Sequence, residues 1–231
     1  PMTRTPDAHF MTEARYRGQK TVVVSPDYSD HTKFADKWLA INPGTDGALA
    51  MAMGHVILRE FYVDRQVDYF QGYSKQFNDL AHLVRLEERD GQRVAGRFLR
   101  ASDLGETGEN AEWKTVIVDQ ATGELVVPNG TLGDRWGAEG EGKWNLELGD
   151  VDPALTLLGH HDETVTVTIS VFGGDGPTSS ALVTRGVPVK RLADGTLVTT
   201  VLDLVFAQYG VGRDGLPGHW PTGYDDEVPF T

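Results

Sequence analysis

The hydrophobic and polar positions of residues 20–61 predict a strand, an acidic loop with a short helix, a second strand, a tight turn and a long helix. Residues 21–24 (TVVV) form a β-branched run that is typical of a buried parallel strand. Pro26 ends this run because proline cannot donate to a strand ladder. Residues 38–41 form a second short apolar run, which Pro43-Gly44 interrupts. Each predicted strand is therefore followed by a polar loop, and ligands bind at that edge of an open α/β sheet.

The long helix after this turn has apolar residues at helical spacing, which predicts that one of its faces is buried. Thr45 or Asp46 can cap its first turn. The apolar residues at helical spacing are Leu49, Met53, Val56, Ile57 and Phe61.

The rest of the chain changes character near residue 93. Before that point, spacing predicts helices at residues 8–16 and 69–77, while residues 80–86 fit either a strand or a helix. After it, short strands and glycine-rich loops dominate, and the clearest alternation is at residues 163–172 (ETVTVTISVF). The other expected elements are strands at residues 113–118, 124–127, 181–184 and 187–192 and a helix at residues 202–209.

These patterns predict an α/β fold with two portions. Residues 1–92 are expected to form a Rossmann-like parallel sheet with flanking helices, of the kind that binds dinucleotides. Residues 93–231 are expected to form a β-rich insertion followed by an irregular tail.

The composition narrows the possible functions. The chain has 231 residues, of which 39% are apolar and 24% charged, as in a soluble globular protein. Its formal net charge of −13 argues against nucleic acid as a partner, because such binding depends on neutralised phosphates. Without cysteine, these residues supply no disulfide, thiolate metal ligand or cysteine-ligated iron–sulfur cluster. The first ten residues (PMTRTPDAHF) start without an initiator methionine, and we expect the chain to be a piece of a larger protein.

The turn that contains Pro43, Gly44 and Asp46 has physical reasons to contact a ligand. Gly44 allows the backbone to approach closely, and free amides at the start of a helix donate to anions or carbonyl groups. The carboxylate of Asp46 can accept two parallel hydrogen bonds, which suits the ring N–H and exocyclic amine of a guanine. On spacing alone, a simple helix cap is the favoured interpretation of Asp46.

The loop after the first strand contains Ser25, Pro26 and Asp27. A dinucleotide-binding fold places in this position an acid that binds ribose hydroxyls, although an ordinary strand-ending turn has the same composition. No G-x-G-x-x-G precedes the loop, so the nicotinamide fingerprint is absent. The two loops together carry more weight than either alone, because they would face one crevice.

The other reactive side chains form no recognisable catalytic or metal-binding set. The seven histidines lack the H-E-x-x-H spacing, and His160 and His161 would face opposite sides of a strand. His55 and His82 are interpreted as surface or packing residues. The glycine-rich residues 173–176 lack the ending of a phosphate loop and are interpreted as a turn. The sequence therefore predicts no catalytic and no metal-ligating residue in this chain.

Several blocks of the sequence resemble the alpha subunits of membrane-bound respiratory nitrate reductases. The order strand–xPD–helix–strand–PGTD–helix alone resembles the wider molybdopterin oxidoreductase (DMSO reductase) superfamily, and the other blocks narrow the resemblance to nitrate reductase. The similarity covers most of the chain and is strongest over residues 3–61 and 112–147. The blocks are TRTPDAH, TVVVSPDY, ADKWLAINPGTDGALAMAMGHVILREF, LEERDG, EWKTV, VVPNGTLGDRWG, GKWNLE, FGGDG and PVKRLADGTLVTTV.

The resemblance implies a formate dehydrogenase/DMSO reductase-like domain that holds one guanine dinucleotide of a bis-molybdopterin guanine dinucleotide cofactor with molybdenum. Many relatives have Asp-Pro-Arg where this chain has Ser25-Pro26-Asp27, so this loop does not supply the arginine that the resemblance implies for the diphosphate, and Arg4 or Lys33 could substitute for it. The implied ribose or guanine contacts are Ser25, Pro26 and Asp27, and the implied contacts to the guanine end are Pro43, Gly44 and Asp46.

The resemblance also implies the activity of the larger protein, which is reduction of nitrate to nitrite by oxygen-atom transfer at molybdenum with electrons from quinol. The implied partners are an iron–sulfur beta subunit and a haem-containing membrane gamma subunit, at the cytoplasmic face of the cell membrane. The family's molybdenum ligand and the ligands of its 4Fe-4S cluster lie outside these residues, so we expect the isolated chain to anchor cofactor and to be inactive.

Two alternatives remain open at this point. The first is a piece of another molybdopterin oxidoreductase, such as a selenate reductase, a perchlorate reductase or a hydrocarbon-oxidising relative, which should lack the GDRWG and GKWNLE blocks. The second is a non-catalytic α/β binding module, which would need no cofactor.

Overall fold

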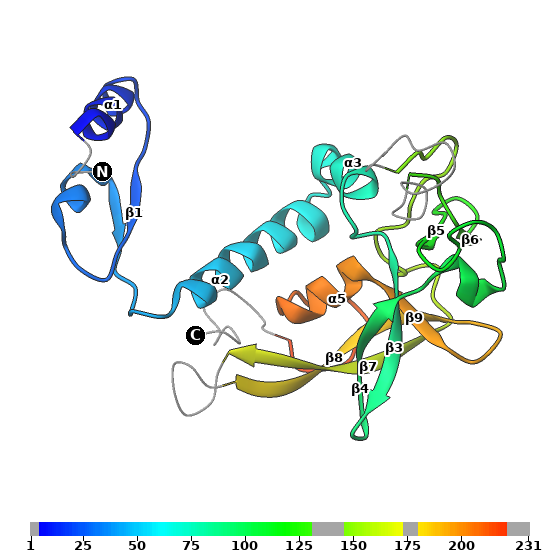
Figure 1. Ribbon diagram of the computed structural model, residues 1–231. Helices are drawn as coiled ribbons and strands as arrows, with labels where there is room; N and C mark the ends of the chain where they lie inside the picture. Colours follow the sequence, from blue (N-terminus) through cyan, green and yellow to red (C-terminus); the bar gives the residue numbers. More distant parts are fainter. Residues whose placement is uncertain (1–4, 131–145, 173–179, 221–231) are drawn as a thin grey trace. The chain divides into compact units, whose positions relative to one another are not determined.

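The chain forms two compact units, residues 1–50 and residues 51–231 (Figure 1). In this computed structural model, the described residues are 5–130, 146–172 and 180–220. The glycine-rich turn at residues 173–176, the GDRWG block, most of the GKWNLE block and the end of the irregular tail lie outside these ranges. No helix among the described residues is long and apolar enough to cross a membrane.

Residues 1–50 contain a two-stranded parallel sheet, β1 (Val22–Val24) and β2 (Lys37–Leu39). Helix α1 (Thr5–Tyr16) precedes β1, the 3-10 helix η1 (Asp30–Phe34) lies between the strands, and α2 (Asp46–Leu58) follows the Pro-Gly turn. The predicted order of strand, short helix, strand, turn and long helix is therefore confirmed.

The predicted Rossmann-like parallel sheet is present in the described residues only as these two strands. A strand inside a larger parallel sheet is covered on both faces. Here Val23 is buried, whereas Val22 and Val24 are 55% and 43% exposed. The predicted strand β1 is confirmed. The prediction that both of its faces are buried is wrong for the described residues, because none of them covers the face that carries Val22 and Val24.

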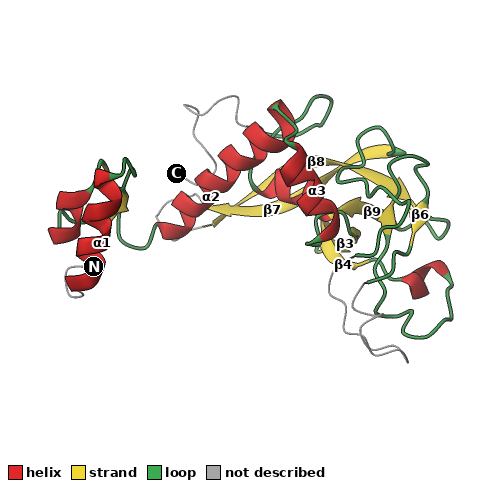
Figure 2. Cartoon of the chain, turned by 90° about the horizontal axis from the view of Figure 1, so that it is seen from above, coloured by secondary structure: helices red, strands yellow, loops and turns green. Residues whose placement is uncertain are grey.

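Residues 51–231 are built on a five-stranded antiparallel sheet in the order β4-β3-β9-β8-β7 (Figure 2). The fold is therefore mixed α/β, with an antiparallel main sheet.

The alternating residues 163–172 are confirmed as a strand, and part of the ambiguous stretch 80–86 enters β3. Residue 92, where the sequence suggests a boundary, begins the second strand of the β3–β4 hairpin. The strands are β3 (Leu83–Arg89), β4 (Gln92–Phe98), β7 (Glu163–Phe172), β8 (Ser180–Arg191) and β9 (Leu197–Thr200).

Strand β8 is continuous, so the prediction of two short strands at residues 181–184 and 187–192 is wrong. Arg185 and Gly186 interrupt the apolar pattern, yet both continue the ladder with β7. The Arg185 side chain is buried and donates to three backbone carbonyl groups at the end of α5 (Val201–Gln208) and beyond it. Burial lowers the pKa of Arg185 to about 10. A Cβ on Gly186 would lie 2.4 Å from Cδ of Pro217. Contacts with residues far away in the sequence therefore explain why an arginine and a glycine stand inside this strand.

Helix α5, which confirms the predicted helix at residues 202–209 to within one residue, connects the hydrophobic core of this unit. Thr200 caps it, because its hydroxyl accepts a hydrogen bond from the backbone N–H of Asp203 at 3.0 Å. Ala207 packs in the cluster over β7 and β8, while Leu202 and Phe206 pack in a second cluster that includes Leu58 of α2. Figure 1 shows α5 lying along one face of β7 and β8.

The remaining elements are short and connect the sheet to the helices. The predicted hairpin is confirmed, but its strands are shorter than expected. The predicted helix at residues 69–77 is also confirmed. These elements are η2 (Arg59–Asp64), α3 (Asp68–Gln76), η3 (Ala101–Leu104), β5 (Ile117–Val118) and β6 (Leu125–Val126).

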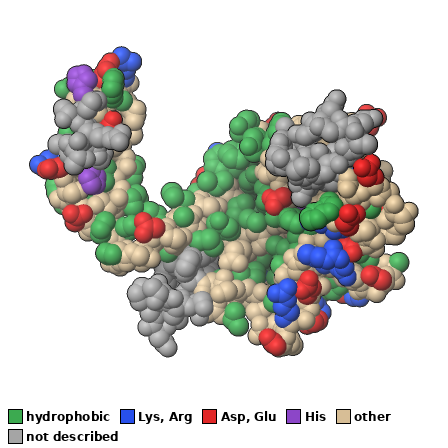
Figure 3. Space-filling view, in the orientation of Figure 1, with side chains coloured by type: hydrophobic (Ala, Val, Ile, Leu, Met, Phe, Trp, Pro, Cys, Tyr) green, Lys and Arg blue, Asp and Glu red, His purple; other side chains and the backbone are tan. Residues whose placement is uncertain are grey.

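Helix α2 does not bury the face that its apolar spacing predicts. Met53 is 54% exposed and Ile57 is 44% exposed, whereas His55 and Leu58 are buried. His55 Nδ1 donates to the carbonyl oxygen of Tyr209 at 2.7 Å. Figure 3 shows hydrophobic side chains gathered over this helix. The prediction of the buried face is therefore wrong, because the contact with the end of α5 turns a different face of α2 inward.

Candidate functional site

The carboxyl ends of β1 and β2 lie side by side, so the two predicted loops leave the sheet at the same edge. The parallel register pairs Val24 with Leu39, which are the last residues of the two strands. The pairing continues one residue further, because the N–H of Ser25 donates to the carbonyl oxygen of Leu39 at 3.1 Å. Both polar loops therefore start from neighbouring strand ends, which is the arrangement that the sequence predicts.

The first loop is held by its own side chains and by β2. Ser25 is buried, and its hydroxyl donates to Oδ1 of Asp27 at 3.0 Å. Trp38 Nε1 donates to the carbonyl oxygen of Ser25 at 2.9 Å, and the Tyr28 ring packs edge-on against Trp38 at 5.3 Å between centroids. Pro26 and Asp27 are exposed. The loop is thus fixed at Ser25 and presents the carboxylate of Asp27 to solvent.

The second loop ends in a turn that opens into α2. The carbonyl oxygen of Thr45 accepts the hydrogen bond from Leu49 N at 3.2 Å, while the Thr45 hydroxyl donates back to the carbonyl oxygen of Asn42 at 2.7 Å. Gly44 has φ +84°, and no heavy atom lies within 4 Å of the position that a Cβ would occupy. The turn therefore needs glycine and leaves free space beside its backbone.

Asp46 does not form the simple helix cap that spacing alone favours. It is the first residue of α2, and its exposed carboxylate accepts no hydrogen bond in the part of the chain that the structure describes. Both carboxylate oxygens are thus available to a ligand, next to the exposed Pro43 and the open space at Gly44. A guanine fits this arrangement, because its N1–H and amine are parallel donors that one carboxylate can accept.

Trp38 has a positioning role that the sequence did not single out. Its indole nitrogen fixes the carbonyl oxygen of Ser25, and its ring supports Tyr28. The sequence feature that could have indicated this role is a tryptophan at the start of the second apolar run. Parallel pairing of the two strands places that tryptophan beside the first loop. Asp27 and Asp46 lie on separate loops at one edge of the sheet. Among the described residues, no hydrogen bond joins the two side chains.

Three cationic side chains of residues 1–50, Arg15, Lys20 and Lys33, line a cavity that includes none of the predicted contacts. Lys33 forms an ion pair with Asp30 at 2.7 Å, and this hydrogen bond raises the pKa of Lys33 and lowers the pKa of Asp30. A cavity of about 450 Å³ is lined by Lys33, Arg15 and Lys20 together with parts of α1, and it includes none of the six predicted residues. Arg4 lies outside the described residues. Lys33 is therefore paired with a carboxylate at the surface, and its substitution for the missing arginine stays a prediction.

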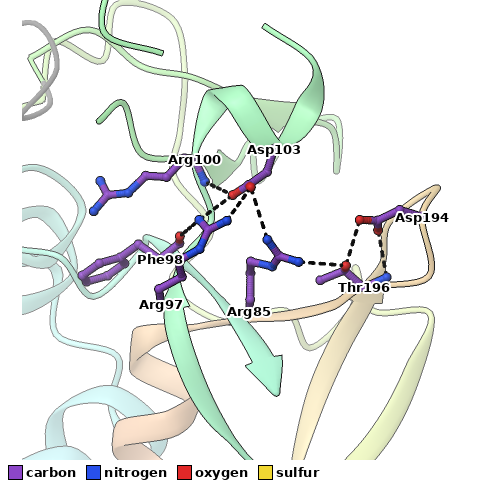
Figure 4. Close-up of polar contacts among 7 residues, drawn as sticks. All are labelled: Arg85, Arg97, Phe98, Arg100, Asp103, Asp194 and Thr196. Carbon is purple, nitrogen blue, oxygen red and sulfur yellow. Dashed lines mark hydrogen bonds and ion pairs between the residues drawn. The ribbon is translucent and has the colours of Figure 1, made fainter. Parts of the chain in front are cut away.

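Unit 51–231 contains a cluster of arginines around Asp103 (Figure 4). Arg97 donates to both carboxylate oxygens at 2.6 and 2.7 Å, and Arg85 and the backbone N–H of Arg100 donate at 3.2 and 2.9 Å. The hydrogen bond from Arg97 is the main reason that the pKa of Asp103 lies below its ordinary value. Because these partners occupy the carboxylate, the cluster joins β3, β4 and η3 and leaves no obvious ligand position.

The described residues contain no group of three or more histidine, aspartate or glutamate side chains that could hold a metal ion.

Known proteins share sequence with nearly the whole chain. A family model described as "Molybdopterin oxidoreductase" matches residues 2–214. The chain is 54% identical over 238 residues to a nitrate reductase alpha subunit of Mycobacterium tuberculosis and 46% identical over 240 residues to a nitrate reductase alpha chain of Bacillus subtilis. It is 48% identical over 250 residues to the respiratory nitrate reductase 1 alpha chain of Escherichia coli. These alignments cover 99–100% of this chain but only 19–20% of the relatives, so the chain spans about a fifth of the length of the curated relatives that it matches.

Proposed function

Because the chain belongs to the molybdopterin oxidoreductase family, we propose that it is the part of a respiratory nitrate reductase catalytic subunit that binds a guanine end of the molybdenum cofactor. The observation that carries this proposal is the identity of 46–54% to nitrate reductase alpha chains over nearly the whole chain. Two polar loops at one edge of the β1–β2 pair support it, because nucleotides bind at that edge of α/β sheets.

In this proposal the cofactor is bis-molybdopterin guanine dinucleotide, and Asp46 accepts the N1–H and amine of one guanine. The exposed, unbonded carboxylate and the free space at Gly44 support this assignment. Pro43 shapes the same turn. Ser25, Pro26 and Asp27 contact the ribose or the guanine from the first loop, and the hydrogen bonds that hold Ser25 support a loop set in place before the ligand arrives.

The residues of this chain bind and orient the cofactor and leave the chemistry to it. When bound, the cofactor supplies the two-electron chemistry at molybdenum that reduces nitrate to nitrite by oxygen-atom transfer. Electrons from quinol would arrive through a haem-containing gamma subunit, an iron–sulfur beta subunit and a 4Fe-4S cluster with ligands elsewhere. The proposed location is the cytoplasmic face of the membrane, and the name of the Escherichia coli relative supports a respiratory role.

The proposal also includes the larger parallel sheet that the sequence predicts. Val22 and Val24 are apolar and exposed on the same face of β1, and strands of a parallel sheet are normally covered on both faces. We expect β1 and β2 to be two strands of a Rossmann-like sheet completed by other parts of the catalytic subunit.

The guanine assignment can be tested by titrating the chain with GDP and following amide resonances of residues 24–28 and 42–48 by NMR. Asp46→Asn should weaken GDP binding at least about tenfold, because one charge-assisted acceptor is lost. The same variant should gain affinity for xanthosine diphosphate, since xanthine carries a carbonyl group where guanine carries an amine and the new amide can donate to it.

Asp68→Asn provides a matched control, because Asp68 is also an exposed first residue of a helix, α3. It should bind GDP as the unsubstituted chain does. Equal binding of GDP and ADP, or an unchanged base preference in Asp46→Asn, would contradict the guanine role of this turn.

A further inference from the structure

Helix α3 points its large aromatic side chains away from the core of unit 51–231. Its one buried residue is Ser74, whose hydroxyl is hydrogen-bonded to the hydroxyl of Tyr62 at 2.6 Å. Tyr69, Tyr73 and Phe77, by contrast, are 73%, 50% and 48% exposed. The helix therefore has a serine inside and aromatic side chains outside, which is the reverse of an ordinary surface helix.

The exposed rings of α3 form a continuous row that reaches the preceding helix. Tyr69, Tyr73 and Phe77 follow one another every four residues, and neighbouring ring centroids lie 6.2 and 5.3 Å apart. The Tyr69 ring lies 5.7 Å from that of Phe70, which in turn lies 5.0 Å from the ring of Phe61 in η2. The aromatic row therefore extends from the end of α3 to the helical turn after α2.

The same apolar surface continues along α2. Met53, Ile57 and Phe61 follow at intervals of four residues, and side chains at this spacing lie on one side of a helix. Figure 3 shows hydrophobic side chains gathered over α2, and Figures 1 and 2 both show α3 beside the end of that helix. We refer to the exposed residues of this surface as the outer stripe, which consists of Met53, Ile57, Tyr69, Tyr73 and Phe77.

The outer stripe is large for an apolar surface that faces water. The exposed parts of its three aromatic side chains alone amount to roughly 300 Å², before Met53 and Ile57 are added. Contiguous apolar patches beyond about a few hundred Å² mark interaction sites on soluble proteins. Tyrosine, phenylalanine and methionine, which form most of the stripe, are also the residue types that are enriched in protein interfaces.

The length of the known relatives indicates what covers this surface. The chain aligns along 99–100% of its own length with nitrate reductase alpha chains, but along only 19–20% of theirs. Most of each relative therefore lies outside the region that aligns with this chain. We propose that the outer stripe packs against an apolar face of another segment of the same catalytic subunit, which buries the three aromatic rings.

This inference rests on the proposed function in one respect, namely that the chain is part of a catalytic subunit. None of the six predicted cofactor contacts belongs to the stripe, and all residues of the stripe lie in unit 51–231. The interface and the guanine site can therefore be tested separately.

Hydroxyl-radical footprinting measures the exposure of methionine and aromatic side chains through their rates of oxidation. In the chain alone, Met53, Tyr69 and Tyr73 should be oxidised rapidly, because all three are at least half exposed. In the full-length catalytic subunit their oxidation should be at least about tenfold slower, as expected when such side chains become buried. Phe206, which is 3% exposed, is the control and should be oxidised slowly in both.

Three outcomes of this experiment overturn the proposal. Equally rapid oxidation of the stripe in the chain and in the full-length subunit shows that no other segment covers it. Oxidation that slows only as the concentration of the chain rises, and not in the subunit, assigns the stripe to a second copy. Slow oxidation in the chain at every concentration shows that the chain covers the stripe itself.

A matched pair of serine substitutions separates this interface from the fold of the chain. Tyr73→Ser should leave deuterium exchange of the α3 amides nearly unchanged in the chain, but should speed it at least about tenfold in the full-length subunit, because a buried contact is lost only there. Tyr62→Ser should speed the exchange in both, because Tyr62 packs against the core and is hydrogen-bonded to Ser74. Equal effects of Tyr73→Ser on the chain and on the subunit overturn the assignment.

Neither measurement depends on the cofactor or on activity. A subunit that covers the stripe, while its chain shows no preference for GDP, contradicts the guanine site alone and supports this interface. A chain that prefers GDP, while its stripe stays exposed in the full-length subunit, contradicts the interface alone.

Discussion

His82 has an imidazole ring that is largely buried immediately before β3. Its Nε2 has no hydrogen-bond partner among the described residues, and the ring packs edge-on against Phe98 at 6.0 Å between centroids. Burial lowers the pKa of His82 from its ordinary 6.5, Arg100 acts in the same direction, and Asp79 opposes them. The native state therefore favours the neutral ring.

Because His82 is buried, we expect its protonation to make the free energy of unfolding depend on pH. Because the pKa of His82 is lower in the folded state, the unfolded chain binds more protons as the pH falls below about 6.5. The free energy of unfolding should fall through that range until the folded-state pKa is reached. His82→Gln should remove this part of the loss, as measured by urea unfolding between pH 5 and 8.

His161→Gln is the control for this prediction, because His161 is exposed. It should keep the pH dependence of the unsubstituted chain. If His82→Gln loses stability on acidification as steeply as that chain does, the protonation of His82 does not contribute.

The roles of single residues could be predicted only where they follow from neighbours in the sequence. The sequence left open whether His55 and His82 are surface or packing residues, and both pack in the fold. The partner of His55 is Tyr209, which lies 154 positions away and has no local signal. Trp38 was missed for a similar reason, since its contact with Ser25 depends on the pairing of two strands.

At the level of elements, the close contact between α2 and the end of α5 depends on Gly54. A Cβ at this position would lie 2.2 Å from Cε1 of Tyr209, so the ring or the helix would have to move. Gly54→Ala should destabilise the chain by about 1–3 kcal/mol through overpacking, reduced by a gain of up to about 1 kcal/mol in helix propensity. Chemical denaturation measures the difference.

Gly72→Ala in α3 gives the matched comparison, because nothing lies within 4 Å of its missing Cβ. Here the propensity gain acts alone, and the variant should be more stable by about 0.5–1 kcal/mol. Equal effects of the two alanines would mean that the Tyr209 contact does not constrain α2.

Elements were predicted well where the pattern is local and poorly where distant contacts decide. The alternation of β7 and the turn before α2 are local, and both are confirmed. The need for glycine inside the continuous strand β8 and the buried face of α2 depend on Pro217 and Tyr209, which approach from the far end of the chain. Hydrophobic spacing shows that a surface is apolar, but it does not show what covers that surface.

At the scale of the whole chain, the sequence predicted two loops at one strand edge but not the antiparallel sheet that dominates the fold. The loops follow from strand order and turn residues, which are readable locally. The sheet order β4-β3-β9-β8-β7 joins strands far apart in the sequence, and no periodicity encodes that pairing. The ligand contacts of Asp27 and Asp46 remain predictions, because the geometry makes them available without supplying the ligand.

The two units should differ in local stability. In the described part of residues 1–50, Val23 is the one buried apolar side chain, and the strands there have three residues each. Residues 51–231 contain three hydrophobic clusters and strands of up to 12 residues. Few buried contacts give low opening free energies, so amides of β1 and β2 should exchange with deuterium at least about a hundredfold faster than those of β7 and β8.

Binding of a guanine nucleotide should slow amide exchange in residues 1–50 and leave exchange in residues 51–231 unchanged. If the loops after β1 and β2 hold a guanine nucleotide, GDP should slow amide exchange in residues 21–49, since a ligand that binds only the folded form stabilises it. Exchange in β7 and β8 should stay unchanged, and Asp46→Asn should abolish the protection. Protection of β7 and β8 by GDP would contradict a nucleotide site confined to the loops of β1 and β2, because the ligand would then stabilise the chain as a whole.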